Sequence, residues 1–171
     1  MKRALIIVDM LKDFVEDYGA LKVEGAKEIV PFIKGLKAGF KRENSPVIYV
    51  CDSHSKNDPE FDLWPPHCIE GTEGAEVVDD LKPDKDDYIV KKSTYSGFHG
   101  TNLDKLLKDL SVETIWVCGV AMNICVHYTA ADARMDGYEV VIPLGGTKGL
   151  TKEDEEYMKK QFANVLKAKL V

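Results

Sequence analysis

The stretch CDSHSKNDPEFDLWPPHC, residues 51–68, places two cysteines, two histidines and several aspartates in one short, turn-rich segment. Cysteine and histidine together are typical of structural zinc sites, and paired cysteines can form disulfides. No C-x-x-C pair occurs anywhere in the chain, which argues against a zinc finger. The third interpretation is that the segment belongs to an active site.

Within this segment, three side chains have the spacing of a catalytic metal site. Asp52 and His54 lie two residues apart directly after an apolar run, and His67 can return across a loop to join them. Three nitrogen and oxygen ligands, with positions left for water, suit a divalent metal such as zinc, iron or manganese. Cys51 should face away from Asp52 and Cys68 should pack inward. The alternative is that both histidines only form hydrogen bonds within a loop.

A second set of residues has the parts needed for acyl transfer. A cysteine is a useful nucleophile only as a thiolate, which requires a nearby cation, a helix N-terminus or a base. Cys125 is expected in the first turn of a helix, Lys92 would supply positive charge, and Asp9 could accept the thiol proton and return it to a leaving amine. The backbone N–H groups of Ala121 and Cys125 could form an oxyanion hole.

Each of these residues also has a structural explanation. Asp9 can cap a turn, Lys92 can be solvated, and Cys125 can be an ordinary core residue on an apolar helix face. The spacing alone leaves both interpretations open.

The elements that must position these residues are five short apolar runs. They are rich in β-branched residues and nearly uniformly apolar, as buried parallel strands are. Asp9, Asp52 and Lys92 each stand at or just beyond the end of such a run. The runs cover residues 4–8, 47–51, 88–91, 114–119 and 138–143.

Amphipathic segments separate these runs and predict helices. Pro31 lies inside the first segment and marks either a kink or a late helix start. Alternating strands and helices imply an α/β fold with a doubly wound, mostly parallel sheet and helices on both faces. In such a sheet ligands bind at the carboxyl ends of the strands, where the candidate residues converge. The helical segments are 25–44, 101–110, 123–137 and 151–170.

The composition limits the classes of protein to which the chain can belong. Its 171 residues, 44% of them hydrophobic, predict a single domain over residues 1–171. The net charge of −6 leaves no basic surface for nucleic acid or an anionic membrane. Charged residues from Asp9 onward interrupt the N-terminal apolar run too early for a signal peptide or membrane span. We therefore expect a cytoplasmic protein with four free thiols.

Several long motifs resemble those of the isochorismatase-like cysteine hydrolases, a superfamily that includes nicotinamidases, N-carbamoylsarcosine amidases and isochorismatases. The motifs are ALIIVDMLKDF, VIYVCDSH, LWPPHCIEGTEGAEV, KKSTYSGFHGTNLDKLL and VCGVAMNICVHYTAADARMDGYEV, and they span nearly the whole chain. The resemblance implies the doubly wound sheet and an Asp-Lys-Cys triad. Carried over by motif, the triad is Asp9, Lys92 and Cys125.

Lys91 competes with Lys92 for the lysine position, and the two should point to opposite faces of one strand. Many family members have lysine, two residues, an aromatic residue, a small pair and phenylalanine. Lys92, Tyr95 and Phe98 fit that spacing. The family also implies a cis peptide bond between Val120 and Ala121.

The resemblance also bears on the metal and on the substrate pocket. In nicotinamidases a D-x-H followed by W-P-x-H-C binds a metal, which implies that Asp52, His54 and His67 are the ligands of a divalent ion, with zinc favoured over manganese or iron. Tyr95 is expected in the substrate pocket. Phe14 and Trp64 would be apolar walls for a flat ring, although either can also be a core residue.

The expected reaction is hydrolysis of a small carboxamide through a thioester, with nicotinamide as the first candidate. A cysteine at position 125 argues against true isochorismatase activity, which needs no such nucleophile. The short stretch from Lys92 to Phe98 instead resembles N-carbamoylsarcosine-amidase-like members, so an N-carbamoyl or other ureido substrate is the alternative. The segment LGGTKGL, residues 144–150, departs from the family pattern at one pocket wall. The family often forms dimers or tetramers, so a homo-oligomer is expected.

Two hypotheses from other classes remain. A non-catalytic binding protein of the same fold would have a Cys125 that reacts with iodoacetamide no faster than an ordinary thiol. A redox sensor would oxidise Cys125 to a sulfenate, but no resolving C-x-x-C cysteine accompanies it.

Overall fold

The central strand of the structure is β1 (Arg3–Val8), with β2 (Val47–Asp52) on one side and β4 (Thr114–Val120) on the other. The structure is a computed structural model that describes residues 2–171. All strand pairs in its seven-stranded sheet are parallel, with the order β3-β2-β1-β4-β5-β7 and with β6 paired to β4. The predicted doubly wound α/β fold is confirmed.

The remaining strands differ in how visible they are in the sequence. β3 (Tyr88–Lys92) and β5 (Glu139–Ile142) agree with predicted apolar runs to within a residue at each end. β6 (Thr147–Lys148) and β7 (Lys169–Leu170) were not predicted, because two residues carry no periodicity. These two short strands exist through their pairing with β4 and β5.

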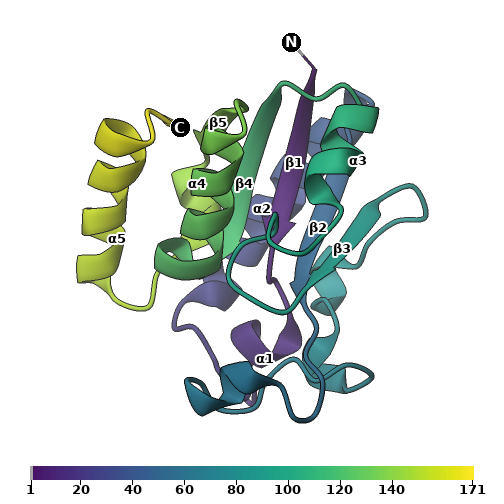
Figure 1. Cartoon of the computed structure of the whole chain (residues 1–171), viewed down its shortest axis with the longest axis vertical. Helices are drawn as coiled ribbons and strands as arrows, with labels where there is room; N and C mark the ends of the chain where they lie inside the picture. The colour runs from purple at the N-terminus through teal and green to yellow at the C-terminus, as the bar shows by residue number, and fades with distance from the viewer. Residues whose placement is uncertain (1) are drawn as a thin grey trace.

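Helices cover both faces of the sheet (Figure 1). The N-terminal side contributes α2 (Val30–Arg42), which packs on one face, and the short α1 (Lys12–Val15). The opposite face carries α3 (Leu103–Asp109), α4 (His127–Met135) and α5 (Lys152–Lys160). Among residues 2–171, no helix is both long and apolar enough to cross a membrane.

Two predicted helices have different ends in the structure. Pro31 occupies the first turn of α2, so it marks a late helix start and not a kink, and a 3-10 turn (Ala26–Ile29) precedes it. The prediction of one helix over residues 151–170 was wrong at its C-terminal end. There, α5 continues into a π-helical turn (Gln161–Val165), and the chain then becomes extended to form β7.

Alternation along β1 divides the core into two halves. Ala4, Ile6 and Val8 pack with α3, α4 and α5, whereas Leu5 and Ile7 pack with α1 and α2. All five are fully buried. Burying an aliphatic side chain of the size of leucine or isoleucine stabilises a fold by about 1.5–3 kcal/mol, so β1 is strongly fixed on both faces. Asp9, which follows β1 directly, is buried as well.

Candidate active site

Asp9 begins the site at the carboxyl end of β1. Its backbone is left-handed, with φ of 51°, which is uncommon for a residue other than glycine and is found often at functional positions. Its Oδ1 accepts a hydrogen bond of 2.8 Å from the backbone N–H of Asp52, and its Oδ2 lies 2.8 Å from Lys92 Nζ. The carboxylate therefore links the ends of β1, β2 and β3.

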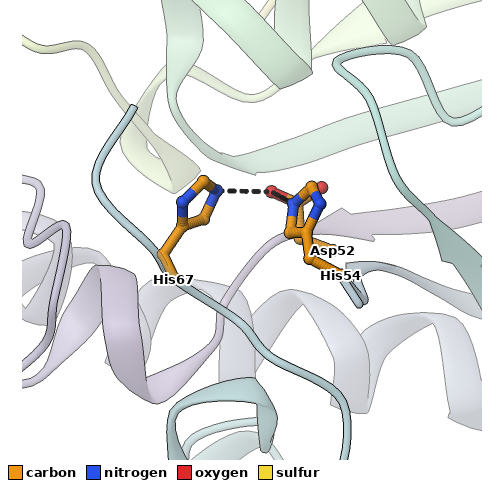
Figure 2. Close-up of side chains that lie close together, drawn as sticks. All are labelled: Asp52, His54 and His67. Carbon is orange, nitrogen blue, oxygen red and sulfur yellow. Dashed lines mark ion pairs between the residues drawn. The ribbon is translucent and has the colours of Figure 1, made fainter. Parts of the chain in front are cut away.

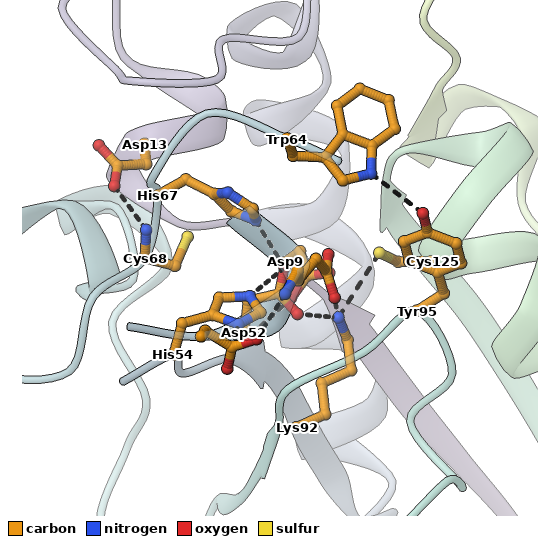
Figure 3. A network of polar contacts seen from close by, with 12 residues as sticks. Asp9, Asp13, Asp52, His54, Trp64, His67, Cys68, Lys92, Tyr95 and Cys125 are labelled. Atoms are coloured by element: carbon orange, nitrogen blue, oxygen red, sulfur yellow. Dashed lines mark hydrogen bonds and ion pairs between the residues drawn. The ribbon is translucent and has the colours of Figure 1, made fainter. Parts of the chain in front are cut away.

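Lys92 lies between two carboxylates and the candidate nucleophile. It is the last residue of β3, in register with Asp52 at the end of β2. Its buried ammonium group forms ion pairs with Asp9 and Asp52 and donates to Cys125 Sγ at 3.5 Å (Figure 3). Lys91 points to solvent and pairs with Glu70, so Lys92 is the lysine that reaches the cluster.

Cys125 reaches the same point from β4. The bond between Val120 and Ala121 is cis, as expected. The chain then enters a π-helical turn (Met122–Val126) that leads directly into α4, so Cys125 lies in the first turn of this helical segment. The N–H groups of Ala121 and Cys125 remain the predicted oxyanion donors.

Gly119 allows β4 to approach β1 at this level. Its φ of 113° is in the region that favours glycine, and a Cβ atom there would lie 1.9 Å from the carbonyl oxygen of Val8. The glycine thus keeps the ends of β1 and β4 close together, next to Asp9.

The electrostatics of the triad indicate where the protons lie. Burial, reinforced by the negative charge of Asp52, raises the pKa of Asp9 to about 6. Burial also raises the pKa of the Cys125 thiol, and the charge of Lys92 opposes this rise. Burial would lower the pKa of Lys92, but the surrounding negative charges raise it well above its usual value. At neutral pH the cluster is therefore a thiol, a mostly ionised carboxylate and an ammonium.

The predicted metal ligands form a second cluster that shares Asp52 with the first. One ligand atom each from Asp52, His54 and His67 can be chosen so that all three lie within 4.8 Å of one another. The nearest ring nitrogens, His54 Nε2 and His67 Nε2, are each 3.6 Å from Asp52 Oδ2 (Figure 2). All three side chains are buried. Burial opposes ionisation of Asp52, but the charge of Lys92 and the neighbouring imidazoles of His54 and His67 lower the pKa of this carboxyl.

The histidines are oriented as metal ligands would be. His67 Nδ1 lies 2.7 Å from the carbonyl oxygen of Pro65, so this nitrogen carries the proton and Nε2 has a free lone pair. Both ring nitrogens of His54 are buried without a hydrogen-bond partner among residues 2–171, although Asp58 Oδ2 approaches Nδ1 to 3.2 Å. A buried imidazole without partners is costly, and coordination would remove that cost. The residues present therefore fit a divalent metal.

A narrow cavity of about 70 Å³ joins the two clusters. Phe14, Trp64 and Tyr95 all line it, together with Cys125 and Asp52. The indole Nε1–H of Trp64 donates to the Tyr95 hydroxyl at 3.0 Å, so the two aromatic residues join loops from different parts of the chain. The structure brings every predicted site residue to one place.

Known proteins share the sequence pattern and the fold of this chain. The family model for the isochorismatase domain matches residues 3–169 of this chain. The chain belongs to the isochorismatase family. The solved structure of nicotinamidase PncA from Bacillus subtilis is 33% identical, with a TM-score of 0.95 over 100% of this chain and 99% of that one. Pyrazinamidase of Pyrococcus horikoshii, solved in complex with zinc, is 35% identical, with a TM-score of 0.94 over 100% and 99%.

N-carbamoylsarcosine amidase from Thermoplasma acidophilum is also similar, at 35% identity and a TM-score of 0.91 over 99% of this chain and 95% of that one. The predicted enzyme class, a hydrolase of non-peptide C–N bonds, is confirmed by the family. The relatives include both substrate types that the sequence left open.

In this isochorismatase-family protein, several cavity residues were not predicted from the sequence. Glu60 lines the cavity beside the metal cluster, and burial together with the charge of Asp52 raises its pKa. Glu60 lies seven residues before His67 and belongs to no recognisable motif. Its place beside the cavity is set by a 3-10 turn (Pro59–Asp62). The other unpredicted lining residues are Leu21, Lys22, Val23, Ile124 and Leu150.

Proposed function

We propose that this protein is a cysteine-dependent amidohydrolase that converts a small carboxamide to the acid and ammonia, with nicotinamide as the preferred substrate. The observation that carries the proposal is the position of Lys92, whose ammonium contacts Asp9, Asp52 and the thiol of Cys125. This ammonium group thus connects the nucleophile, Cys125, to the metal-ligand set through Asp52, beside one apolar cavity.

The reaction follows from the groups around the thiol. Cys125 attacks the amide carbon while its proton passes to Asp9, whose raised pKa of about 6 suits both uptake and release near neutral pH. Lys92 stabilises the thiolate, and the N–H groups of Ala121 and Cys125 hold the oxyanion. Asp9 then protonates the amide nitrogen, which leaves as ammonia. In the second half, Asp9 takes a proton from the water that attacks the thioester, and it returns this proton to the Cys125 sulfur as the acid is released.

Asp52, His54 and His67 would hold a divalent metal, for which zinc is the first candidate. When bound, the metal would act as a Lewis acid that orients a ring nitrogen or a water molecule. Zinc is supported by the imidazole-rich ligand set and by the zinc complex of the Pyrococcus relative. Phe14 and Trp64 offer apolar surfaces for a flat ring.

The second candidate substrate is an N-carbamoyl compound. A cavity of about 70 Å³ is small for a six-membered ring, since an engineered cavity of about 150 Å³ is known to hold benzene. A ureido group is more compact than a pyridine ring and needs less of this space. The short stretch between Lys92 and Phe98 supports the same alternative.

Ammonia release tests both substrates. The purified protein would be stripped of metal with a chelator, then assayed with nicotinamide and with N-carbamoylsarcosine, before and after addition of zinc or manganese. Metal-dependent release from nicotinamide is expected. Release from the N-carbamoyl substrate alone would replace nicotinamide by the second candidate. No ammonia release from either substrate, or from a wider panel of amides, would favour a non-catalytic binding protein.

The hydrogen bond between Trp64 and Tyr95 makes a prediction about substrate binding. Tyr95→Phe removes the acceptor of the indole N–H but keeps the ring, so the cavity wall loses one support worth about 1 kcal/mol. We expect KM to rise by roughly fivefold, with kcat nearly unchanged, because the change removes uniform binding. Tyr128→Phe is the matched control, since Tyr128 stacks on Tyr95 with ring centroids 5.6 Å apart. A fall in kcat without a change in KM would contradict this role.

Three further properties stay predictions. The four cysteines are free thiols, which supports a cytoplasmic location. We infer a single domain over residues 1–171, and a dimer or tetramer is expected from the family.

A further inference from the structure

The two histidines of the metal cluster are linked through the backbone that follows His67, which begins with Cys68. Cys68 follows His67 directly, and its carbonyl oxygen accepts a hydrogen bond of 3.0 Å from the backbone N–H of His54. The next residue, Ile69, forms a bridge with His54. Cys68 is also held in the left-handed region, with φ of 46°. The Cys68 peptide therefore lies directly between the backbones of the two histidines.

Asp13 is the side chain that fixes this backbone. Its Oδ2 accepts a hydrogen bond of 2.7 Å from the N–H of Cys68 (Figure 3). Its Oδ1 accepts one of 3.1 Å from the N–H of Ala20. Both oxygens of the carboxylate thus bind backbone donors. Hydrogen bonds to a charged acceptor are shorter and stronger than neutral ones, so this contact holds the loop firmly.

Gly74 closes the other side of the Asp13 carboxylate. A Cβ atom on Gly74 would lie 2.1 Å from Asp13 Oδ2, so only glycine leaves room for the carboxylate in its present position. The segment around Gly74 is anchored by Lys12, whose ammonium pairs with Glu73 at 3.2 Å and Glu76 at 2.9 Å. The Asp13 carboxylate is therefore enclosed by the backbone of Cys68, Ala20 and Gly74.

Helix α1, which carries Asp13, also contacts the predicted metal ligand His67 directly. Phe14 is the next residue of α1, and its ring centroid lies 5.4 Å from that of His67. Thus α1 touches the His67 loop at the imidazole through Phe14 and at the backbone through Asp13. Neither contact involves Lys92 or Cys125.

We propose that Asp13 is a positioning residue for the metal site, which sets the separation of His54 and His67 by holding the Cys68 peptide between them. The inference rests on the metal site of the proposed function. Residues that orient metal ligands typically contribute 10–100-fold to metal affinity, and Asp13 acts on two ligands at once.

The test measures metal binding directly. Asp13→Asn keeps the size of the side chain but replaces one acceptor oxygen by an NH₂ group, which cannot accept from a backbone N–H. We expect its zinc dissociation constant, measured by competition with a chromophoric chelator, to rise by about 10–100-fold. The absorption spectrum of bound cobalt should shift as well, because the ligand geometry changes. Asp17→Asn is the control, since Asp17 is an exposed carboxylate of the same segment that pairs only with Lys22 at 3.0 Å among the ion pairs of residues 2–171.

A second variant leaves Asp13 in place. Gly74→Ala displaces the carboxylate and should weaken zinc binding in the same direction. The alkylation rate of Cys125 should stay within twofold of wild type in both variants, which separates lost positioning from general unfolding. Wild-type zinc affinity and an unchanged cobalt spectrum in both variants would overturn the inference alone. Absence of zinc binding by the wild-type protein would overturn it together with the proposed metal site.

Discussion

Replacing Cys125 by alanine is expected to abolish ammonia release, with kcat/KM reduced by roughly 10⁴-fold or more, as for other enzymes that lose their nucleophile. The thiol is the only cysteine sulfur that the described residues place in contact with Lys92. Without this thiol no thioester can form, so the proton transfer by Asp9 and the positive charge of Lys92 cannot promote hydrolysis. The measurement is ammonia release from whichever amide the wild-type protein hydrolyses, at saturating zinc.

Cys118→Ala is the matched control for this variant. Cys118 is a fully buried thiol of β4, and its Sγ lies 3.6 Å from the carbonyl oxygen of Ile6. Its side chain packs in the half of the core that does not contain Cys125. Its loss should lower stability modestly and leave kcat/KM unchanged. If the Cys125 variant retained more than a tenth of wild-type activity, a thioester mechanism at this residue would be ruled out.

The second large effect is expected from Lys92→Met. Methionine fills similar space but leaves the carboxylates of Asp9 and Asp52 buried without their shared cation. We expect kcat/KM to fall by roughly 10⁴-fold, as for another triad member. The free energy of unfolding should also fall, by about 3 kcal/mol, the lower end of the range for breaking a buried ion pair, because Asp9 can take up a proton.

Lys91→Met provides the comparison within the same strand. Lys91 is exposed and pairs with Glu70, so its loss should cost about 1 kcal/mol or less. Kinetics and urea unfolding of the two variants, measured side by side, test the assignment of the lysine. Equal effects at the two positions would falsify it.

The strand ends were predictable because buried parallel strands leave a strong signal. The uniformly apolar run followed at once by Asp52 marks both β2 and the edge where ligands bind. The signal is weaker for β3, an edge strand in which Tyr88 and Ile89 are exposed and Lys91 precedes Lys92. Register along β3 also separates Lys91 from Lys92, which the structure bears out in the exposure of the first and burial of the second.

The missed parts depend on contacts between distant residues. Glu60 enters the cavity because a 3-10 turn aims it there, and nothing in its neighbours' sequence reports the direction. Asp13 gains its partner, the N–H of Cys68, from a segment 55 positions along the chain. The short strands β6 and β7 likewise exist only through pairing, so local propensity could not predict them.

The meeting of several strand ends at Lys92 has a consequence for the newly made chain. Lys92 and Cys125 lie 33 residues apart in the sequence and come together only when β4 has docked against β1. Before that step Cys125 has neither its cation nor its base, and its reactivity is that of an ordinary thiol. Completion of the sheet is thus what supplies the nucleophile with both its cation and its general base.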